Sequence, residues 1–406
     1  MSGALDGLRV LDFSHAILGP SCTAILADHG ADVIKVERPG QGDSTRAFGP
    51  FFDGESLPYV GLNRNKRSLA IDLKTPEGRE IIFRIIPGVD VVVSNFRPGV
   101  MESLGLGYDE LCRRNSRLVY AIGSGYGQSG PYADRGKAGH ETMAQALSGV
   151  AHANADRDGN PKTVPVPVAD VSGGNLLVQG ILMALLARER TGRGQRVDVA
   201  LLDGVMWLQG WSVARPADST NNLGPRAGQD PLSGGVYRTQ DGRVILTHVF
   251  RPNPLREICA ALEIDDLSRD PRFGSRETLA EHADELRTVL QTRLLEKTTA
   301  EWVRILDVAD IMCAPVQSLD AAIEDPQVLH NRMVIELDHP PHGRVKIAGV
   351  PVKLSETPGQ VRTPAPSIGR DTAKILAECG YGQSEIADLY RRKIVAGGEP
   401  VTVSGG

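Results

Sequence analysis

The N-terminal half of the chain alternates between short apolar runs and helix-like segments, and no other feature of the sequence constrains the fold as strongly. The expected strands are the runs Leu8–Phe13, Asp32–Val36, Val91–Val93, Leu118–Ile122 and Arg196–Val199. Helical patterns lie between them, at Gly19–Ala27, Glu77–Ile86 and Gly174–Arg190. Short strands that alternate with helices are typical of a parallel sheet covered by helices. The sequence therefore predicts an α/β fold for this part of the chain.

The chain is too long for one core, and its pattern changes near residue 205. It has 406 residues, whereas single hydrophobic cores stop growing at roughly 250–300 residues. Two short strands flank the turn pair Asp241-Gly242 of an expected β-hairpin, and helical segments follow at Pro254–Leu262, Glu277–Leu295 and Thr299–Val308. We expect a large domain at 1–203, completed by about 370–406, and a small α+β domain at 225–320. Residues 204–224 and 321–369 are expected to be linkers.

Composition and charge argue against several classes of function. The net charge is −5, which does not suit a protein that coats nucleic acid or an anionic membrane. Met1–Asp6 lacks the features of a signal peptide, and the longest apolar run, Leu176–Ala187, is shorter than the ~20 residues of a membrane span. The five cysteines are scattered, without metal-ligand spacing. We expect a cytoplasmic protein with no metal site and with neither nucleic acid nor a membrane as partner.

The first turn between a strand and a helix, Ser14–Pro20, lies where many α/β folds bind a nucleotide. It lacks the G-x-G-x-x-G fingerprint, so binding of NAD or FAD is not supported. The helix start could still hold a phosphate or a carboxylate. Basic residues near the expected strand ends are Lys35, Arg38, Arg64, Lys66, Arg67, Lys74 and Arg97. They could converge on a polyphosphate ligand, and the alternative is a set of solvated surface charges.

Asp170 is the acid whose surroundings point most directly to chemistry. It follows the apolar run Val164–Ala169 and precedes Ser172-Gly173-Gly174, where it would be partly removed from water and where the backbone could approach a ligand closely. The alternative is that Asp170 or Ser172 is the N-cap of the next helix. His140 and Glu141 lie just before another helix. They could transfer a proton, although a single histidine beside a helix start also has structural uses.

Several segments together resemble the class III CoA-transferase (CaiB/BaiF) family, including its formyl-CoA transferase type. They are Gly7–Phe13, Gly30–Asp43, Asn63–Ser68, Asn95–Gly99, Gly130–Tyr132, Ala169-Asp170, Thr191–Gln195 and Asp325–Gln327. Each motif is weak alone, whereas their combination in this order, from about residue 5 to 390, is specific. The resemblance implies a Rossmann-like large domain and a smaller domain joined by two linkers into a ring. It also implies that two such rings interlock as a homodimer.

The resemblance further implies the chemistry of the site. Asp170 would attack an acyl-CoA, and aspartyl anhydride and aspartyl-CoA thioester intermediates would follow. Coenzyme A would be the group carried between an acyl-CoA and a small carboxylic acid, with no permanently bound cofactor. The positions that match CoA contacts of the family are Ala16, Arg38, Ile71, Asp72, Leu73, Lys74, Asn95, Phe96, Arg97 and Lys137.

Other residues are expected near the substrate or its oxyanions, and some depart from the family pattern. They are Ile17, His140, Glu141, Gly234 and Gly235, the last two in a glycine-rich loop whose N–H groups could stabilise an oxyanion. The formyl-CoA type has glutamine where this chain has Ile17, and its glycine run is longer, which argues against oxalate or formate as substrate. An arginine common in the family is replaced by Ser103, so one phosphate contact is expected to be missing or moved.

Two other functions remain open. In the α-methylacyl-CoA racemase branch of the family, a Gly-His-Asp segment supplies a histidine base, and Gly139-His140-Glu141 is close to it. The following Ala144-Gln145-Ala146 matches the transferase type instead. An epimerase would use His140 and Asp170 as its two bases. The third reading is a non-catalytic acyl-CoA-binding protein, in which Asp170 would be unreactive.

Overall fold

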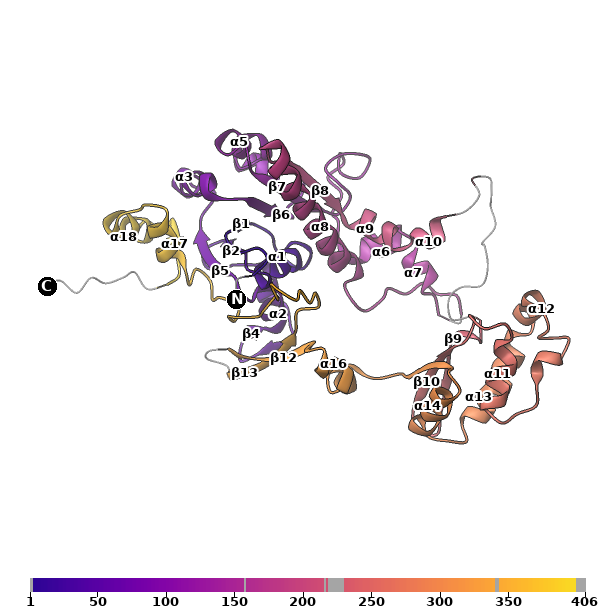
Figure 1. The fold of residues 1–406 in the computed structure, drawn as a ribbon. Coiled ribbons are helices and arrows are strands. Elements are labelled where there is room, and N and C mark those ends of the chain that lie inside the picture. Colours follow the sequence, from indigo (N-terminus) through magenta and orange to yellow (C-terminus); the bar gives the residue numbers. More distant parts are fainter. Residues whose placement is uncertain (1–2, 157, 215–216, 218–229, 340–342, 399–406) are drawn as a thin grey trace. The chain divides into compact units, whose positions relative to one another are not determined.

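The segments predicted as strands in the N-terminal half form one sheet in the computed structural model, which describes residues 3–156, 158–214, 217, 230–339 and 343–398. Its strands are β1 (Arg9–Asp12), β2 (Asp32–Glu37), β5 (Arg67–Ile71), β6 (Val91–Ser94), β7 (Val119–Ser124), β8 (Arg196–Ala200) and β14 (Val395–Ala396). The order is β14-β5-β2-β1-β6-β7-β8, and only β14 runs antiparallel to its neighbour. Figure 1 shows β1, β2 and β6 in the middle of this sheet. The predicted α/β class, with a large and mostly parallel sheet, is confirmed.

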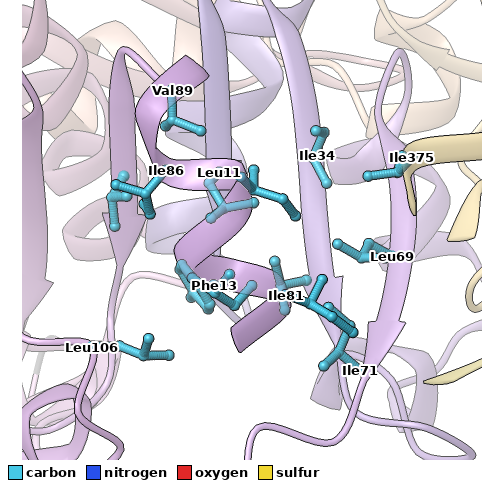
Figure 2. Close-up of a cluster of buried hydrophobic side chains, with 14 of the residues drawn as sticks. Leu11, Phe13, Ile34, Leu69, Ile71, Ile81, Ile86, Val89, Leu106 and Ile375 are labelled. Atoms are coloured by element: carbon cyan, nitrogen blue, oxygen red, sulfur yellow. The ribbon is translucent and has the colours of Figure 1, made fainter. Parts of the chain in front are cut away.

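Both faces of the sheet are buried at its central strands, which explains the continuous apolar runs of those strands. At the edge, β8 exposes Arg196 and Asp198. Side chains alternate along β1, so that Val10 belongs to one hydrophobic cluster and Leu11 to another. Figure 2 shows the Leu11 cluster, in which Ile34 of β2 and Leu69 of β5 lie near Ile81 and Ile375 of two covering helices.

Helices cover the two faces. The Leu11 face packs against α3 (Pro76–Ile85), α5 (Tyr108–Arg114), α17 (Thr372–Glu378) and α18 (Gln383–Arg391), and the Val10 face against α1 (Leu18–Asp28) and α8 (Val168–Thr191). The shorter elements are η1 (Ser44–Ala47), β3 (Phe51–Phe52), β4 (Glu55–Ser56), α2 (Leu57–Asn63), η2 (Ile86–Gly88), α4 (Val100–Ser103), α6 (Glu141–Leu147), α7 (Val150–Ala153), α9 (Leu201–Leu208) and α10 (Gly210–Val213).

The chain divides into two compact units. The first unit is Met1–Ala214 with Leu329–Gly406, and the second is Arg215–Val328. Residues 204–213, expected in a linker, are helical in α9 and α10, and most of 214–229 lies outside the described residues. The other expected linker, 321–369, contains α16 (Pro326–His330) at the boundary and a hairpin of β12 (Val334–His339) and β13 (Gly343–Ala348) in the first unit.

The second unit is a small α+β structure with its own core. The predicted hairpin is present as β9 (Ser233–Arg238) and β10 (Arg243–Thr247), and β11 (Met312–Pro315) completes an antiparallel sheet. Its helices are α11 (Pro254–Ala261), η3 (Leu267–Arg269), α12 (Arg276–Glu281), α13 (Ala283–Leu294), α14 (Thr299–Val308) and α15 (Leu319–Ala322). The single helix expected at Glu277–Leu295 is interrupted at His282. Trp302 is the largest fully buried side chain, and its indole N–H donates to the Leu294 carbonyl at 2.8 Å.

Helix α8 is the longest element and has two different sides. By length and composition alone it would be long and apolar enough to cross a membrane, a test that core helices of soluble proteins also pass. One side, with Leu177 and Ile181, is fully buried in the Val10 cluster. The other exposes Met183 and Leu186 at 67% and 66% of their surface. The helix is therefore a core element of the first unit that leaves an apolar side uncovered within this chain.

Candidate active site

Asp170 lies in the first turn of α8, and its backbone is fixed by a carboxylate from another helix. The helix begins at Val168, earlier than expected, with Pro167 as N-cap. Glu141, the first residue of α6, accepts the N–H of Ala169 at 3.1 Å and that of Asp170 at 2.8 Å. The expectation that Asp170 or Ser172 is the cap is wrong, because Glu141 supplies this function. The Asp170 carboxylate is thereby left available for chemistry.

Glu141 is itself held in place. It is buried, at 8% exposure, and the side-chain N–H of Gln145 donates to its Oε1 at 2.7 Å. Gln145 also accepts the N–H of Val164 at 2.8 Å and donates to the Val164 carbonyl at 3.2 Å. The apolar run before Asp170 is thus tied to α6 at one end and capped by it at the other. Glu141 takes no part in a proton-transfer pair with His140 in this arrangement, because both of its oxygens accept backbone N–H groups.

The Asp170 carboxyl is harder to ionise than an ordinary aspartate. Burial, followed by the charge of Glu141, raises its pKa from 3.8 to about 6. The charge of His140 and a hydrogen bond from the backbone of Leu18 act in the opposite direction. At neutral pH the group is therefore mostly ionised but incompletely solvated, which is a favourable state for a carboxylate nucleophile.

Three glycines allow the start of α1 to approach α8 closely. A Cβ on Gly173 would lie 3.0 Å from a methyl group of Leu18, and one on Gly174 would lie 2.9 Å from the Leu18 carbonyl oxygen. A Cβ on Gly123 of β7 would lie 2.1 Å from the other Leu18 methyl group. Gly173 and Gly174 therefore admit α1, whereas the sequence suggested that they admit a ligand. Their close packing explains how the Leu18 backbone reaches Asp170.

His140 is the N-cap of α6, and one of its two ring nitrogens takes part in the cap. Its Nδ1 accepts from the N–H of Thr142 at 3.5 Å and lies 3.2 Å from the Thr142 hydroxyl. The other ring nitrogen is not used in the cap, and the side chain is exposed. Its charge lowers the pKa of Asp170. His140 can therefore face a substrate at Asp170, in keeping with its predicted place in the site.

A cavity of about 620 Å³ opens where β1, β2, β5 and β6 end, the edge at which open parallel sheets bind ligands. Six of the predicted CoA positions line it, namely Arg38, Ile71, Asp72, Leu73, Lys74 and Phe96. Ala16, Asn95, Arg97 and Lys137 are not among its lining residues. The wall combines apolar side chains with Arg38 and Lys74, which could meet an adenine ring and phosphates, respectively. Its acids include Glu37 and Asp43, and these two are paired with buried or partly buried cations of the fold.

The sequence did not single out the other ten residues of the wall: Phe13, His15, Val36, Glu37, Gln41, Gly42, Asp43, Ser44, Ala47 and Leu104. Most of them lie in the motifs Gly7–Phe13 and Gly30–Asp43 or just after them. Position soon after the end of the first parallel strand was the signal that could have identified His15, and position in the loop that follows the second strand could have identified Asp43. The imidazole of His15 packs against the Phe96 ring, with 5.4 Å between ring centroids.

Two lysines of the predicted basic cluster are buried and paired. Lys35 and Lys66 are fully buried. The Lys35 ammonium lies 2.7 Å from a carboxylate oxygen of Asp43, and that of Lys66 lies 3.2 Å from Asp12. Burial, which outweighs the attraction of Asp12, lowers the pKa of Lys66 to about 8. Neither ammonium is free to bind a phosphate.

Two arginines of the cluster are also used within the fold. Arg64 pairs with Asp28 at 2.6 Å, and Arg67, at the start of β5, pairs with Asp32 at 2.6 Å. The polyphosphate expectation is therefore wrong for these residues, because carboxylates of the fold hold both guanidinium groups. Arg38 and Lys74 are the members of the cluster that line the cavity.

Lys137 lies on the loop before α6, against two tyrosines. Its ammonium is 4.4 Å from the centre of the Tyr132 ring and 5.8 Å from that of Tyr126. The Tyr126 hydroxyl donates to the Ala138 carbonyl at 3.1 Å, which closes the loop. Lys137 is exposed and so remains accessible to a ligand.

Gly234 and Gly235 belong to the second unit and lie in strand β9, not in a loop. Ser233 pairs with Thr247, Gly235 pairs with Leu246, and Gly234 occupies the irregularity between them with φ at 77°. Its N–H donates to the Thr247 hydroxyl at 3.0 Å. The irregularity is a β-bulge, for which glycine is favoured at positive φ. Their role near the oxyanion stays a prediction.

Ser103 closes the short helix α4, and its hydroxyl donates to the Val100 carbonyl at 2.7 Å. The side chain is exposed and carries no charge. It cannot replace the phosphate contact of the arginine that the family commonly has there. Among the described residues, no group of His, Cys, Asp and Glu is arranged to hold a metal ion.

Comparisons with known proteins show which family the chain resembles. The chain is 34% identical to a formyl-CoA:oxalate CoA-transferase of Rhodopseudomonas palustris, over 96% of this chain and 97% of that protein. It is 32% identical to a succinyl-CoA–D-citramalate CoA-transferase of Chloroflexus aurantiacus, over 96% and 98%. A CaiB/BaiF family protein of Brucella suis has a similar structure, with a TM-score of 0.83, 29% identity and coverage of 93% and 100%.

Residues 5–372 match the sequence profile of CoA-transferase family III. The match includes Asp170, the whole cavity wall and the second unit, and it ends at the start of α17. The family predicted from the motifs, and an enzyme of the CoA-transferase type, are confirmed. The chain belongs to CoA-transferase family III.

Proposed function

We propose that the protein transfers coenzyme A from an acyl-CoA to a carboxylic acid, with Asp170 as the nucleophile. The observation that carries the proposal is the half-buried Asp170 carboxylate, whose pKa is raised to about 6 and whose backbone is fixed by Glu141. The cavity supports it as well. His15 lines that cavity and Leu18 contacts Asp170, and three residues of chain span at most about 11 Å. A CoA thioester could therefore have its nucleotide end in the cavity and its acyl end at Asp170.

The proposed reaction has four steps at the carboxylate. An oxygen of Asp170 attacks the thioester carbonyl, the C–S bond breaks, and CoA thiolate leaves a mixed anhydride. The thiolate attacks the Asp170 carbonyl of the anhydride, which releases the donor acid and forms an aspartyl-CoA thioester. The acceptor carboxylate attacks this thioester and again expels the thiolate. Attack of the thiolate on the acceptor's acyl carbon forms the new acyl-CoA and restores Asp170, with no net change in protons or oxidation state.

Each attack creates an oxyanion that needs hydrogen-bond donors. We propose that backbone N–H groups supply them, with Gly234 and Gly235 as candidates. The Gly234 N–H would have to leave the Thr247 hydroxyl to act in this way. Ile17 and His140 are proposed to face the acyl group or the acceptor. An apolar Ile17 adds no hydrogen bond for a second carboxylate, which supports acids other than oxalate or formate.

The CoA moiety is proposed to occupy the cavity, with Arg38 and Lys74 near its phosphates and Lys137 as a further cation. Charge-assisted hydrogen bonds to phosphate are strong, so loss of one should raise KM by about 10- to 100-fold. Arg38→Ala should raise KM for every acyl-CoA donor by a similar factor, whereas an effect confined to one acyl group would place Arg38 elsewhere.

We further propose that the chain acts as an interlocked homodimer in the cytoplasm. Exposed apolar residues of α8, α9 and α10 support a second copy as partner, since Leu186, Trp207 and Trp211 leave 66%, 73% and 95% of their surface uncovered. All five cysteines are free, which suits a reducing compartment. Sedimentation that found a stable monomer at micromolar concentration would end the dimer proposal.

A panel of acyl-CoA donors and carboxylic acid acceptors, read by mass spectrometry of the CoA esters, tests the function directly. Hydroxylamine added after an acyl-CoA should convert Asp170 to a hydroxamate, which peptide mass spectrometry would locate. The racemase alternative predicts instead that deuterium from the solvent enters a 2-methylacyl-CoA and that His140→Ala stops it. A binding protein would show neither transfer nor labelling.

A further inference from the structure

Both polar atoms of the Asn95 side chain are hydrogen-bonded to the backbone of a single residue. Asn95 follows β6, at the edge of the sheet where the cavity opens. Its Oδ1 accepts the N–H of His15 at 2.8 Å, and its Nδ2 donates to the His15 carbonyl at 2.6 Å. The amide therefore holds His15 from both sides, as a paired strand would. The two bonds fix the orientation of the amide against His15, and Asn95 is not among the residues that line the cavity.

The loop that Asn95 holds has an unfavourable backbone and two further anchors. Ala16 has φ at 63°, in the left-handed region that residues other than glycine seldom adopt. Its N–H donates to Asp43 Oδ1 at 3.1 Å, and the Lys35 ammonium donates to the Ser14 carbonyl at 2.8 Å. A strained conformation persists only when its surroundings fix it. Asn95, Asp43 and Lys35 together supply that fixation.

This loop joins the cavity to the nucleophile. His15 lines the cavity and packs on Phe96, the residue after Asn95. Leu18, at the loop's other end, donates a backbone hydrogen bond to Asp170 and fits against Gly173 and Gly174. A shift of His15 would therefore reach both the CoA site and the carboxylate.

We infer that Asn95 is a positioning residue, which holds the backbone of His15 and so sets the start of α1 against α8, and that its side chain does not bind CoA. The consequence for catalysis rests on the proposed function. Family resemblance matches Asn95 to a CoA contact. Here the residue instead holds the backbone next to the cavity.

Asn115 provides a matched control in the same unit. Its Nδ2 donates to the carbonyls of Ile86 and Val89 at 3.1 and 2.8 Å, and its Oδ1 accepts the N–H of Arg117 at 3.0 Å. It thus holds a loop through its amide as Asn95 does, but it lies before β7, at the opposite edge of the sheet from the cavity. Asn115→Ala should lower thermal stability and leave the loop at 14–18 unchanged.

Hydrogen–deuterium exchange of the peptide that covers residues 14–18 is the first measurement. Asn95→Ala, and Asn95→Asp as a variant of nearly the same shape, should raise exchange there by at least about tenfold, while Asn115→Ala should not. Asn95→Asp is included because it keeps the volume of the side chain and the acceptor for the His15 N–H, while it places a carboxylate oxygen against the His15 carbonyl in place of the donor. Unchanged exchange in a folded Asn95 variant would overturn the inference.

The second measurement is the pH dependence of transfer. Loss of the Leu18 hydrogen bond should raise the pKa of Asp170, so the acidic limb of kcat/KM should move to higher pH and kcat should fall by about tenfold or more. A side chain that merely contacted CoA would raise KM with kcat and the limb unchanged, and that result would refute the positioning role. If the wild type transferred no CoA, the proposed function would fail, while the exchange experiment would still decide how Asn95 acts on the loop.

Discussion

Two carboxylates of the first unit are both removed from water, but the charges around them have opposite signs. Asp12, at the end of β1, is fully buried and receives hydrogen bonds from the Ser14 and Thr23 hydroxyls and from the Lys66 ammonium. Asp170, at the start of α8, faces the negative charge of Glu141. Burial alone would raise both pKa values, yet the charges of Lys35 and Lys66 hold that of Asp12 far below its usual range.

The two acids differ in how far the fold compensates their charge. The charge of Asp12 is neutralised and all its lone pairs are directed at donors, so it stabilises the structure and has little tendency to attack an electrophile. The charge of Asp170 is poorly compensated, which costs stability and favours bond formation. Strain of this kind at a functional group is a common feature of active sites. The same substitution at the two positions should therefore have opposite consequences.

The largest expected effect is on catalysis at Asp170. Asp170→Asn should reduce CoA transfer by roughly 10⁴-fold or more, because an amide of nearly the same shape is a poor nucleophile. Binding of CoA should be retained, since the proposed phosphate contacts lie elsewhere. The measurement is initial rate with mass spectrometry of the CoA esters. An active variant, with deamidation back to aspartate excluded by mass, would show that Asp170 is not the nucleophile.

Next in size is the loss of stability at Asp12. Asp12→Asn leaves Lys66 and Lys35 buried with one fewer negative charge, and breaking a buried ion pair costs about 3–5 kcal/mol. Thermal unfolding should occur at a clearly lower temperature than in the wild type. A variant as stable as the wild type would mean that the lysines can lose their protons at little cost, and the contrast between the two acids would then disappear.

Asp170→Asn should instead stabilise the folded protein at neutral pH. Because the folded carboxyl has a pKa of about 6 rather than 3.8, it keeps its proton between these values while the unfolded chain has lost it. Stability of the wild type should therefore fall as pH rises from about 4 to 6. The variant should be more stable above pH 6 by up to about 3 kcal/mol, at about 1.4 kcal/mol per pKa unit. Melting curves at pH 4 and pH 7.5 would reveal the gain, which should be absent at pH 4.

The smallest effect is expected at Glu141. Glu141→Gln removes the charge that helps to raise the pKa of Asp170, so the acidic limb of kcat/KM should move to lower pH. One of the two N–H groups that Glu141 caps would face an amide N–H, at a cost of about 1 kcal/mol in stability. Gln145→Leu serves as a control, since it loosens Glu141 and keeps its charge. If the acidic limb of kcat/KM moved equally in Glu141→Gln and Gln145→Leu, the position of Glu141, and not its charge, would be the cause of the shift.

The sheet could be predicted from sequence because its determinants are local. Runs such as Leu8–Phe13 and Val91–Val93 are apolar on both faces, and a strand buried on both sides requires that pattern. The hairpin at Asp241-Gly242 was likewise encoded in its turn residues. The start of α8 was not, because its cap is Glu141, which lies 29 residues earlier in the chain.

The sequence by itself determined the α/β class, the family and the identity of the candidate nucleophile, since strand periodicity, turn residues and ordered motifs can be recognised without the fold. Only the tertiary structure decided how the charged and polar residues are used. Lys66 and Asp12 are 54 residues apart and Asn95 and His15 are 80 apart, and no spacing rule relates them. Which cation is paired and which is free depends on strand order and register, because a one-residue shift turns a side chain to the other face of the sheet. For this reason Arg38 and Lys35 are close in sequence, yet Arg38 lines the cavity and Lys35 is buried against Asp43.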